Sequence, residues 1–326
     1  MTNIKPEEST GSLRSRFIEP PFSVLDARSG EWRKRKEKWL ALGIESELGR
    51  NAECQIGVTD FNYMPDMKSG TSIFDPALCE LLYRWFAPEH AIILDPFSGG
   101  SVRGIVANSL GHEYLGIDLR KEQVDANIEQ GKKLLPADNQ PIWLCGDSNK
   151  ILDDLFERSF DFIFSCPPYA NLEVYSKDEN DLSNMPYAEF LLAYRSIINK
   201  SVKQLKEGHF AVFVVGDVRG EDGYYLDFIS DTKKAFIDSG AGLYNEAILL
   251  DPIGTAMIRA NNSFGSKKLV KVHQNVLCFK KGGNPNALNK KIILDYINKC
   301  DECNGKIKRL SDGVRICEDC MKIFAS

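Results

Sequence analysis

The chain has 326 residues, of which 43% are hydrophobic and 27% charged, and its formal net charge at pH 7 is −5. These values are typical of a soluble globular protein, and the length favours one large domain with small appendages. No apolar run approaches the roughly 20 residues that cross a bilayer, which argues against a membrane partner. Residues 1–12 lack the apolar stretch of a secretion signal, and nine cysteines without such a signal favour the reducing cytoplasm.

The charge is unevenly distributed along the chain. Residues 261–326 hold 13 Lys and Arg against 6 Asp and Glu, whereas residues 1–260 hold 28 against 40. A basic C-terminal fifth on an acidic body suits a polyanion, because phosphate contacts dominate nucleic-acid binding. A lysine-rich solvated surface explains the same counts equally well.

The first 58 residues are predicted to form an extension with one basic helix. Residues 30–40 place Trp32 and Trp39 seven positions apart on one helical face, with five Lys and Arg between them. The basic side suits phosphate contacts, but a docked helix with a solvated basic face accounts for the same pattern. A second helix is predicted over 75–86, with Asp75 as its N-cap and a proline at its first position.

After residue 86 the pattern alternates between strand, turn and helix, which indicates the α/β class with a doubly wound parallel sheet. The last two strands are joined without a clear helix, which predicts an antiparallel pair at one edge. The predicted strands are 91–94, 113–117, 142–145, 160–165, 210–215, 247–250 and 275–279. The predicted helices are 101–110, 121–134, 149–156, 187–205 and 226–239.

The strand 160–165 runs directly into Cys166, Pro167, Pro168 and Tyr169. Two prolines cannot continue a strand, since each fixes φ and lacks an N–H group. The chain must therefore leave the sheet at the carboxyl end of the strand, where ligands bind in open α/β sheets. Rigid carbonyls beside an aromatic face suit a flat heterocycle with an exocyclic amino group. An ordinary strand that ends in a Pro-Pro turn explains the segment equally well.

Three successive predicted strands each end in an aspartate, namely Asp95, Asp118 and Asp147. Asp95 precedes a Gly-Gly turn, and Asp118 follows that turn by about 20 positions, the place of an acid that holds a ribose diol. A carboxylate-rich rim suits an adenosyl sulfonium cofactor better than a dinucleotide pyrophosphate. Helix N-caps explain any one of these aspartates, but they explain all three poorly. Residues 216–219, after the fifth strand, are candidates for the same rim.

Residues 95–100, Asp-Pro-Phe-Ser-Gly-Gly, followed by the Cys-Pro-Pro-Tyr segment at 166–169, resemble the amino-methyltransferases of the DNA N6-adenine/N4-cytosine class. The similarity is to solitary phage and bacterial members, whose setting is DNA methylation and restriction-modification, and it covers about residues 60–280. It implies a Rossmann-like class I fold with seven strands, mostly parallel, and an antiparallel edge strand. It also implies S-adenosylmethionine as cofactor and double-stranded DNA as partner.

The resemblance also implies the roles of individual residues. Residues 72–76 are similar to the segment that packs on the methionine end of the cofactor. The implied cofactor-binding residues are Phe74, Asp75, Asp95, Phe97, Ser98, Gly99, Gly100, Asp118, Asp147 and Ser148. The implied catalytic residues are Cys166, Pro167, Pro168 and Tyr169.

The chain departs from the family at the first catalytic position. The family has Asp, Asn or Ser there, whose oxygen accepts a hydrogen bond from the target amino group, whereas Cys166 offers a weak acceptor. The Pro167 carbonyl and Tyr169 are retained. A covalent role for Cys166, as in cytosine-C5 methyltransferases, is disfavoured because those enzymes place the proline before the cysteine. Adenine and cytosine both remain open as the target base.

Cys300, Cys303, Cys317 and Cys320 form two Cys-x2-Cys pairs separated by thirteen residues. Four thiolates fit a structural zinc ion, although the gap is slightly shorter than usual. Two disulfides are the alternative, and a reducing compartment disfavours them. Between the pairs, residues 305–313 are predicted to form a small β-hairpin.

These observations predict three regions, 1–58, 59–283 and 284–326, as extension, methyltransferase domain and linker helix with zinc module. The favoured function is methylation of an exocyclic amino group in DNA after base flipping. An RNA amino-methyltransferase and a non-catalytic zinc-containing nucleic-acid-binding protein on the same scaffold are the alternatives. We expect a monomer or weak dimer, in which residues 251–273 share target recognition with the zinc tail.

Overall fold

The computed structural model divides the chain into two units, one formed by Ser23–Gly283 and the other by Met1–Phe22 together with Asn284–Ser326. Part of the predicted extension 1–58 thus contributes a strand and a helix to the larger unit. None of the helices in the described part of the chain is long and apolar enough to cross a membrane. The described residues are 12–45, 74–155, 160–168, 181–253, 256–284, 307–309, 315–317 and 323–324.

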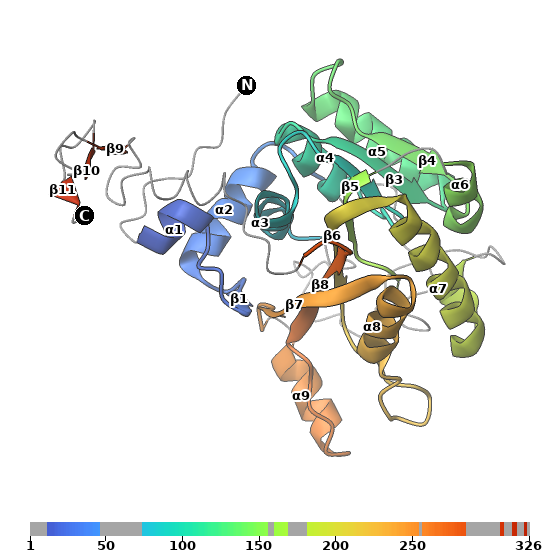
Figure 1. The fold of residues 1–326 in the computed structure, drawn as a ribbon. Helices are drawn as coiled ribbons and strands as arrows, with labels where there is room; N and C mark the ends of the chain where they lie inside the picture. The colour runs from blue at the N-terminus through green and yellow to red at the C-terminus, as the bar shows by residue number, and fades with distance from the viewer. Residues whose placement is uncertain are drawn as a thin grey trace. The chain divides into compact units, whose positions relative to one another are not determined.

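The larger unit is built on an eight-stranded sheet with the order β1-β7-β8-β6-β5-β2-β3-β4 (Figure 1). Strand β8 runs antiparallel to both of its neighbours, and every other neighbouring pair is parallel. This mixed sheet confirms the predicted α/β class. The strands are β1 (Val24–Asp26), β2 (Ile92–Asp95), β3 (Glu113–Asp118), β4 (Ile142–Cys145), β5 (Phe160–Ser165), β6 (Leu205–Val215), β7 (Ala241–Leu250) and β8 (His273–Lys281).

Three features correct the predicted topology. The prediction of seven strands was wrong, because β1 adds an eighth that pairs with β7 at one edge. This strand has three residues and a single buried side chain, Leu25, too few for an alternating pattern in the sequence. The antiparallel strand β8 lies between β6 and β7 rather than at an edge. The β7–β8 connection, predicted to be without a clear helix, contains helix α9 (Ala256–Phe264), of which only Ala256 is buried.

Helices cover both faces of the sheet. On one face α3 packs against α2 and α4, and α4 and α5 pack on β3. On the other face α7 packs between α6 and α8, with α6 on β3 and α8 on β7 and β8 (Figure 1). The helices are α2 (Gly30–Leu40), α3 (Pro76–Phe86), α4 (Val102–Ser109), α5 (Lys121–Leu134), α6 (Ser148–Asp154), α7 (Tyr187–Gln204) and α8 (Phe228–Asp238).

The core lies on both sides of β5. Phe162, Ile163 and Phe164 are fully buried in succession, as expected for a parallel strand with helices on both faces. Further along the sheet, Phe236 of α8 stacks on Phe279 of β8 with ring centroids 4.0 Å apart. The rigid centre of the sheet therefore fixes where β5 ends and the Cys-Pro-Pro segment begins.

The basic helix α2 docks on α3 around a buried carboxylate. Glu80 is fully buried on α3 and receives a bidentate pair of hydrogen bonds from Arg35. Trp39 Nε1 donates to Glu80 Oε2 at 2.8 Å, and Arg84 Nε donates to Oε1 at 3.0 Å. Buried charges are stable only when they are paired in this way. The docked-helix interpretation of residues 30–40 is thus the one that the structure supports.

The smaller unit contains α1 (Ser12–Phe17) and a three-stranded antiparallel sheet with the order β11-β10-β9. The predicted hairpin is present as β9 (Ile307–Arg309) and β10 (Arg315–Cys317), and β11 (Ile323–Phe324) extends it. Cys317 ends β10 and pairs with Ile307. The other three cysteines predicted to bind zinc, and the linker helix predicted before them, lie outside the described residues.

Candidate functional site

A cavity of about 670 Å³ opens at the carboxyl ends of the parallel strands. It brings together predicted residues from the ends of β2, β3, β4 and β5 and from the start of α3. Among the predicted site residues, those that line it are Phe74, Asp75, Phe97, Gly99, Gly100, Asp118, Asp147, Ser148, Cys166, Pro167 and Pro168. Of the rim candidates 216–219, Gly216, Asp217 and Val218 line it as well. Asp95 and Ser98 lie fully buried beside it, and Tyr169 lies outside the described residues.

The turn after β2 is held by side chains along its whole length. All four backbone carbonyls from 96 to 99 accept a hydrogen bond from a side chain. The donors are Ser148 Oγ, Arg103 Nη2, which reaches two of the carbonyls, and Asn127 Nδ2. Gly99 has a φ of +50°, and a Cβ there would meet nothing within 4 Å. The left-handed backbone at this position favours glycine. The open space beside Gly99 is part of the cavity.

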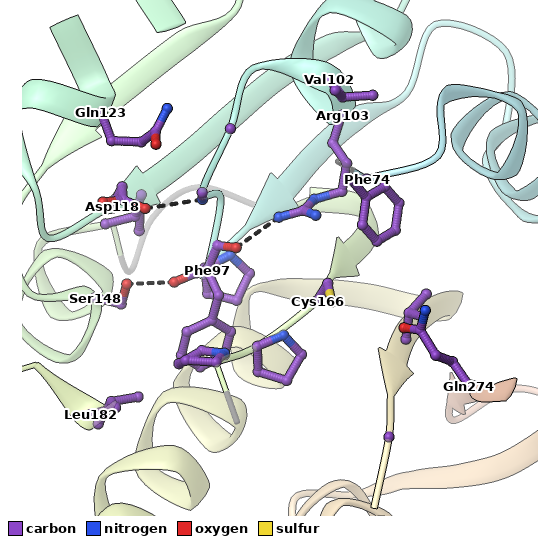
Figure 2. Close-up of a pocket in the computed structure, with 18 of the residues that line it drawn as sticks. Phe74, Phe97, Val102, Arg103, Asp118, Gln123, Ser148, Cys166, Leu182 and Gln274 are labelled. Carbon is purple, nitrogen blue, oxygen red and sulfur yellow. Dashed lines mark hydrogen bonds between the residues drawn. The ribbon is translucent and has the colours of Figure 1, made fainter. Parts of the chain in front are cut away.

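Asp118 connects this turn to the end of β3. Its carboxylate accepts hydrogen bonds from the backbone N–H groups of Gly99, at 3.0 Å, and Arg120, at 2.9 Å. Burial raises the pKa of Asp118 to about 6, against the lowering effect of these N–H groups. A carboxylate has about four lone-pair sites, so Asp118 retains acceptor capacity for the two hydroxyls of a diol. Figure 2 shows Asp118 and Gln123 on one side of the cavity and Cys166 and Gln274 on the other.

Asp95, one of the predicted cofactor-binding residues, is fully buried beside the cavity and is not among the residues that line it. Its carboxylate accepts from Arg103 Nε at 2.5 Å, Tyr114 Oη at 2.7 Å and Ser165 Oγ at 2.6 Å. The pair is closed to solvent, with exposed fractions of 0% for Asp95 and 5% for the Arg103 side chain. Asp95 is therefore the counterion of the arginine that clamps the turn. It also links that turn to Ser165, the residue before Cys166.

The Cys-Pro-Pro segment forms the wall opposite Asp118. Cys166 is half-buried and lines the cavity, with Pro167 buried beside it. Phe74 packs edge-on against Phe164 with centroids 5.6 Å apart, and the Arg103 guanidinium lies 4.6 Å from the Phe74 ring centroid. The arginine that holds the turn thus also supports the aromatic wall next to Cys166 (Figure 2).

Several charged or polar residues of the cavity were not predicted as part of any site, among them Arg103 and Gln274, and Lys36 was predicted only as part of the basic helix. Asp251, Lys271 and His273 were predicted only as part of the recognition segment 251–273, not as residues of this cavity. Asp251 follows the end of β7 directly, so the strand-end rule that found Asp118 would have found it as well. Lys36 had no such signal, because it belongs to a helix whose docking depends on a distant segment. Among the described residues there is no group of three or more His, Cys, Asp or Glu side chains suited to a metal ion.

The strand order, the single reversed strand beside β6 and the cavity at the carboxyl ends of β2 to β5 define the Rossmann-like class I fold of S-adenosylmethionine-dependent methyltransferases. No protein-family model matches the chain, and no curated protein matches its sequence.

The structure is similar to TrmN from Thermus thermophilus, with a TM-score of 0.43 and 16% identity over 63% of this chain and 48% of TrmN. The chain thus spans about half the length of TrmN. It is similar to a methyltransferase from Pyrococcus furiosus, with a TM-score of 0.42 and 14% identity over 69% of this chain and 89% of that one. It is also similar to a candidate DNA modification methylase from Thermus thermophilus, with a TM-score of 0.32 and 17% identity over 47% of this chain and 60% of that one.

Proposed function

We propose that this protein is an S-adenosylmethionine-dependent methyltransferase that modifies an exocyclic amino group, adenine N6 or cytosine N4, in double-stranded DNA. One observation carries the proposal: the glycine turn, the strand-end carboxylate Asp118 and the Cys-Pro-Pro segment line a single cavity. The glycine turn and the Cys-Pro-Pro segment are about 70 residues apart in the chain. They can act on one ligand only because the fold brings them to the same cavity. The basic C-terminal fifth supports a polyanionic substrate.

The chain's residues fit the cofactor. The open face of Gly99 and the spare acceptor capacity of the Asp118 carboxylate suit an adenosine moiety, with Asp118 on the ribose hydroxyls. Asp147 and Ser148, at the start of α6, line the wall beyond the ribose position. The cofactor supplies a methyl group on a positively charged sulfur.

The residues around Cys166 are the ones that we assign to the target base. The Pro167 carbonyl and the Cys166 thiol accept from the target amino group, and Tyr169 is expected to stack on the base. A base inside a duplex cannot reach this cavity, so the target nucleotide must be flipped out of the stack. Because the nucleophile is the amine itself, the protein contributes chiefly position and polarisation.

The first test is transfer of a tritiated methyl group from S-adenosylmethionine to unmethylated duplex DNA, followed by mass spectrometry of the product nucleosides. We expect labelled N6-methyladenine or N4-methylcytosine. A Tyr169→Ala chain should lose transfer and retain S-adenosylhomocysteine binding. Label on RNA but not on DNA would favour the RNA amino-methyltransferase, and DNA binding without transfer to either polymer would favour the non-catalytic alternative.

The same assay addresses target recognition, which we assign to residues 251–273 together with the C-terminal tail. Helix α9 in that segment exposes Met257 (73%) and Phe264 (56%). Residues 256–272 contain four Lys and Arg and no acidic residue, a combination that suits contacts with phosphates and bases. A chain that lacks 284–326 should methylate a different set of sites, and unchanged site choice would contradict the role of the tail.

We also propose that Cys300, Cys303, Cys317 and Cys320 bind one structural zinc ion. The pairing of Cys317 with Ile307 supports this, because Ile307 lies four residues after Cys303 in the chain. Four thiolates make a closed site, which has a structural rather than a catalytic role. Elemental analysis of the full-length protein, purified without chelator, should find about one zinc per chain. A protein that is free of zinc and retains an ordered tail would contradict the assignment.

A further inference from the structure

We propose that Lys36, with Asp75 and Asp251, holds the amino-acid end of S-adenosylmethionine, an assignment that rests on the proposed function. These three charged residues line the same cavity as Asp118 and Cys166. They come from α2, the start of α3 and the end of β7. A site with one ammonium group and two carboxylates suits a ligand end that carries one carboxylate and one ammonium group.

The position follows from the three substituents of the sulfonium sulfur. With Asp118 assigned to the ribose and Cys166 to the target base, the adenosyl group would extend towards Asp118 and the methyl group would face the segment at Cys166. The third substituent is the amino-acid chain, and it is left with the remaining wall, which Phe74 and Asp75 line. Figure 2 shows Phe74 and Cys166 on the side of the cavity away from Asp118.

Asp95 is not available to the amino group of this ligand. Arg103, Tyr114 and Ser165 donate to its two oxygens, and the carboxylate is closed to solvent. A ligand ammonium would have to displace a buried guanidinium, which would leave that charge unpaired in the interior, a strongly unfavourable state. The amino group therefore needs another carboxylate on the cavity wall.

Lys36 is held in position by the docking of α2. Its Nζ lies 3.4 Å from Asp75 Oδ2, and Trp32 Nε1 donates to the same oxygen at 3.1 Å. Trp32 and Lys36 are four residues apart, so they lie one above the other on the docked face of the helix. Asp75 is itself fixed as the N-cap of α3, where its Oδ1 accepts from the N–H of Ala77 at 2.9 Å. The Lys36 side chain is 33% exposed, so a ligand can reach it.

Asp251 supplies the second carboxylate. Its oxygens accept from Gln274 Nε2 at 3.3 and 3.4 Å. Burial raises the pKa of Asp251, and nearby Asp75 raises it further, whereas Gln274, His273 and Lys36 lower it. Asp251 is thus repelled by Asp75 and attracted by Lys36, while Lys36 itself pairs with Asp75. A bound zwitterion relieves this repulsion through its ammonium group and pairs its carboxylate with Lys36.

The experiment measures binding of three nucleosides by isothermal titration calorimetry. S-adenosylhomocysteine has the full amino-acid end, its decarboxylated form lacks only the carboxylate, and 5′-methylthioadenosine lacks both groups. We expect Lys36→Met to weaken S-adenosylhomocysteine binding about 10- to 100-fold, the range for one charge-assisted hydrogen bond. Binding of 5′-methylthioadenosine should stay within about twofold. The matched control is Lys34→Met on the same helix, where Lys34 is 64% exposed and pairs with Glu31; it should change neither affinity.

Two further comparisons complete the test. Wild-type protein should bind decarboxylated S-adenosylhomocysteine about 10- to 100-fold more weakly than the parent. This comparison needs no variant, so equal binding of the two ligands would overturn the proposal even where Lys36→Met fails to fold. Lys36→Arg, which keeps the charge, should retain most of the affinity.

Each outcome has one meaning. Equal weakening of all three nucleosides by Lys36→Met would assign Lys36 a structural role and overturn the proposal. Unchanged S-adenosylhomocysteine binding by Lys36→Met would overturn it as well, without touching the proposed function. Wild-type protein that binds none of the three nucleosides would instead refute the proposed function.

Discussion

Replacing Asp95 with asparagine is expected to lower the free energy of unfolding by about 3–5 kcal/mol. The carboxylate is fully buried and is the counterion of Arg103, whose side chain is 5% exposed. An amide in its place leaves the guanidinium charge uncompensated in a low-dielectric interior, and it also exchanges one acceptor oxygen for a donor. Thermal and urea unfolding measure the effect, and for a chain of this size the melting temperature should fall by about 10 °C.

A matched substitution separates this effect from the loss of an ordinary ion pair. Asp125→Asn removes a carboxylate that pairs with Lys121 at 2.6 Å, but this pair is largely exposed, with side-chain fractions of 55% and 72%. Exposed pairs of this kind contribute little to stability, because water and salt screen them. If Asp95→Asn had the same melting temperature and urea midpoint as Asp125→Asn, the buried network would not be the element that holds the turn after β2.

The sequence predicted the parts of the site that follow from local rules. Two prolines after an apolar strand can only lie at a strand end, and aspartates after successive strands of a parallel sheet must share one rim. These rules place Asp118, Asp147 and Cys166 on one cavity, which the structure confirms for the described residues. The strand ends needed no knowledge of tertiary packing, because parallel strands share their direction.

The parts that were missed depend on contacts between distant segments. Arg103 on α4 forms a buried ion pair with Asp95 at the end of β2. The sequence of neither segment alone predicts this pair. Strand β1 exists because β7 offers it an edge, since three residues carry too little pattern. In the sequence, Lys36 is one of five basic residues on a single helix, and nothing in that helix distinguishes it from the others. Its position follows from the contacts of α2 with Asp75 and Glu80, which determine the docked face of the helix.

These contacts also explain why an eighth strand and a docked helix belong to the site. Ala27, which follows β1, lines the cavity, and α2 begins three residues later. Trp32 and Lys36 reach Asp75, while Arg35 and Trp39 reach Glu80 on the same helix α3. The segment 24–40 therefore forms part of one wall of the cavity. Among the described residues of α2, Lys36 is the one that lines it.

The affinity for S-adenosylhomocysteine is expected to depend on pH through Asp118. Burial raises the pKa of this carboxyl to about 6, and the ribose hydroxyls donate more strongly to its ionised form, in which both oxygens accept and carry the charge. Protonation therefore competes with binding, so the dissociation constant should be ~10-fold higher at pH 5 than at pH 8. Titration calorimetry in buffers of different ionisation enthalpy should detect release of a proton on binding near pH 6.

Asp118→Asn tests this origin of the pH dependence. The variant should bind S-adenosylhomocysteine about 10- to 100-fold more weakly at pH 8, as expected for lost charge-assisted hydrogen bonds, and its remaining affinity should vary little between pH 5 and pH 8. Asp138→Asn, on the exposed turn after α5, is the control and should retain both affinity and pH dependence. If the affinity of Asp118→Asn still depended on pH in the same way, another titrating group in the cavity would be responsible for the pH dependence.

The choice of ligand separates this residue from Lys36. Asp118 is assigned to the ribose, which 5′-methylthioadenosine and S-adenosylhomocysteine share, so Asp118→Asn should weaken both by a similar factor. Lys36→Met should weaken only the ligand with an amino-acid end. Because the two side chains act on opposite ends of one ligand, their effects on S-adenosylhomocysteine should be additive in the double variant to within about 0.5 kcal/mol. Strong non-additivity would mean that both act through a shared change in the turn at Gly99.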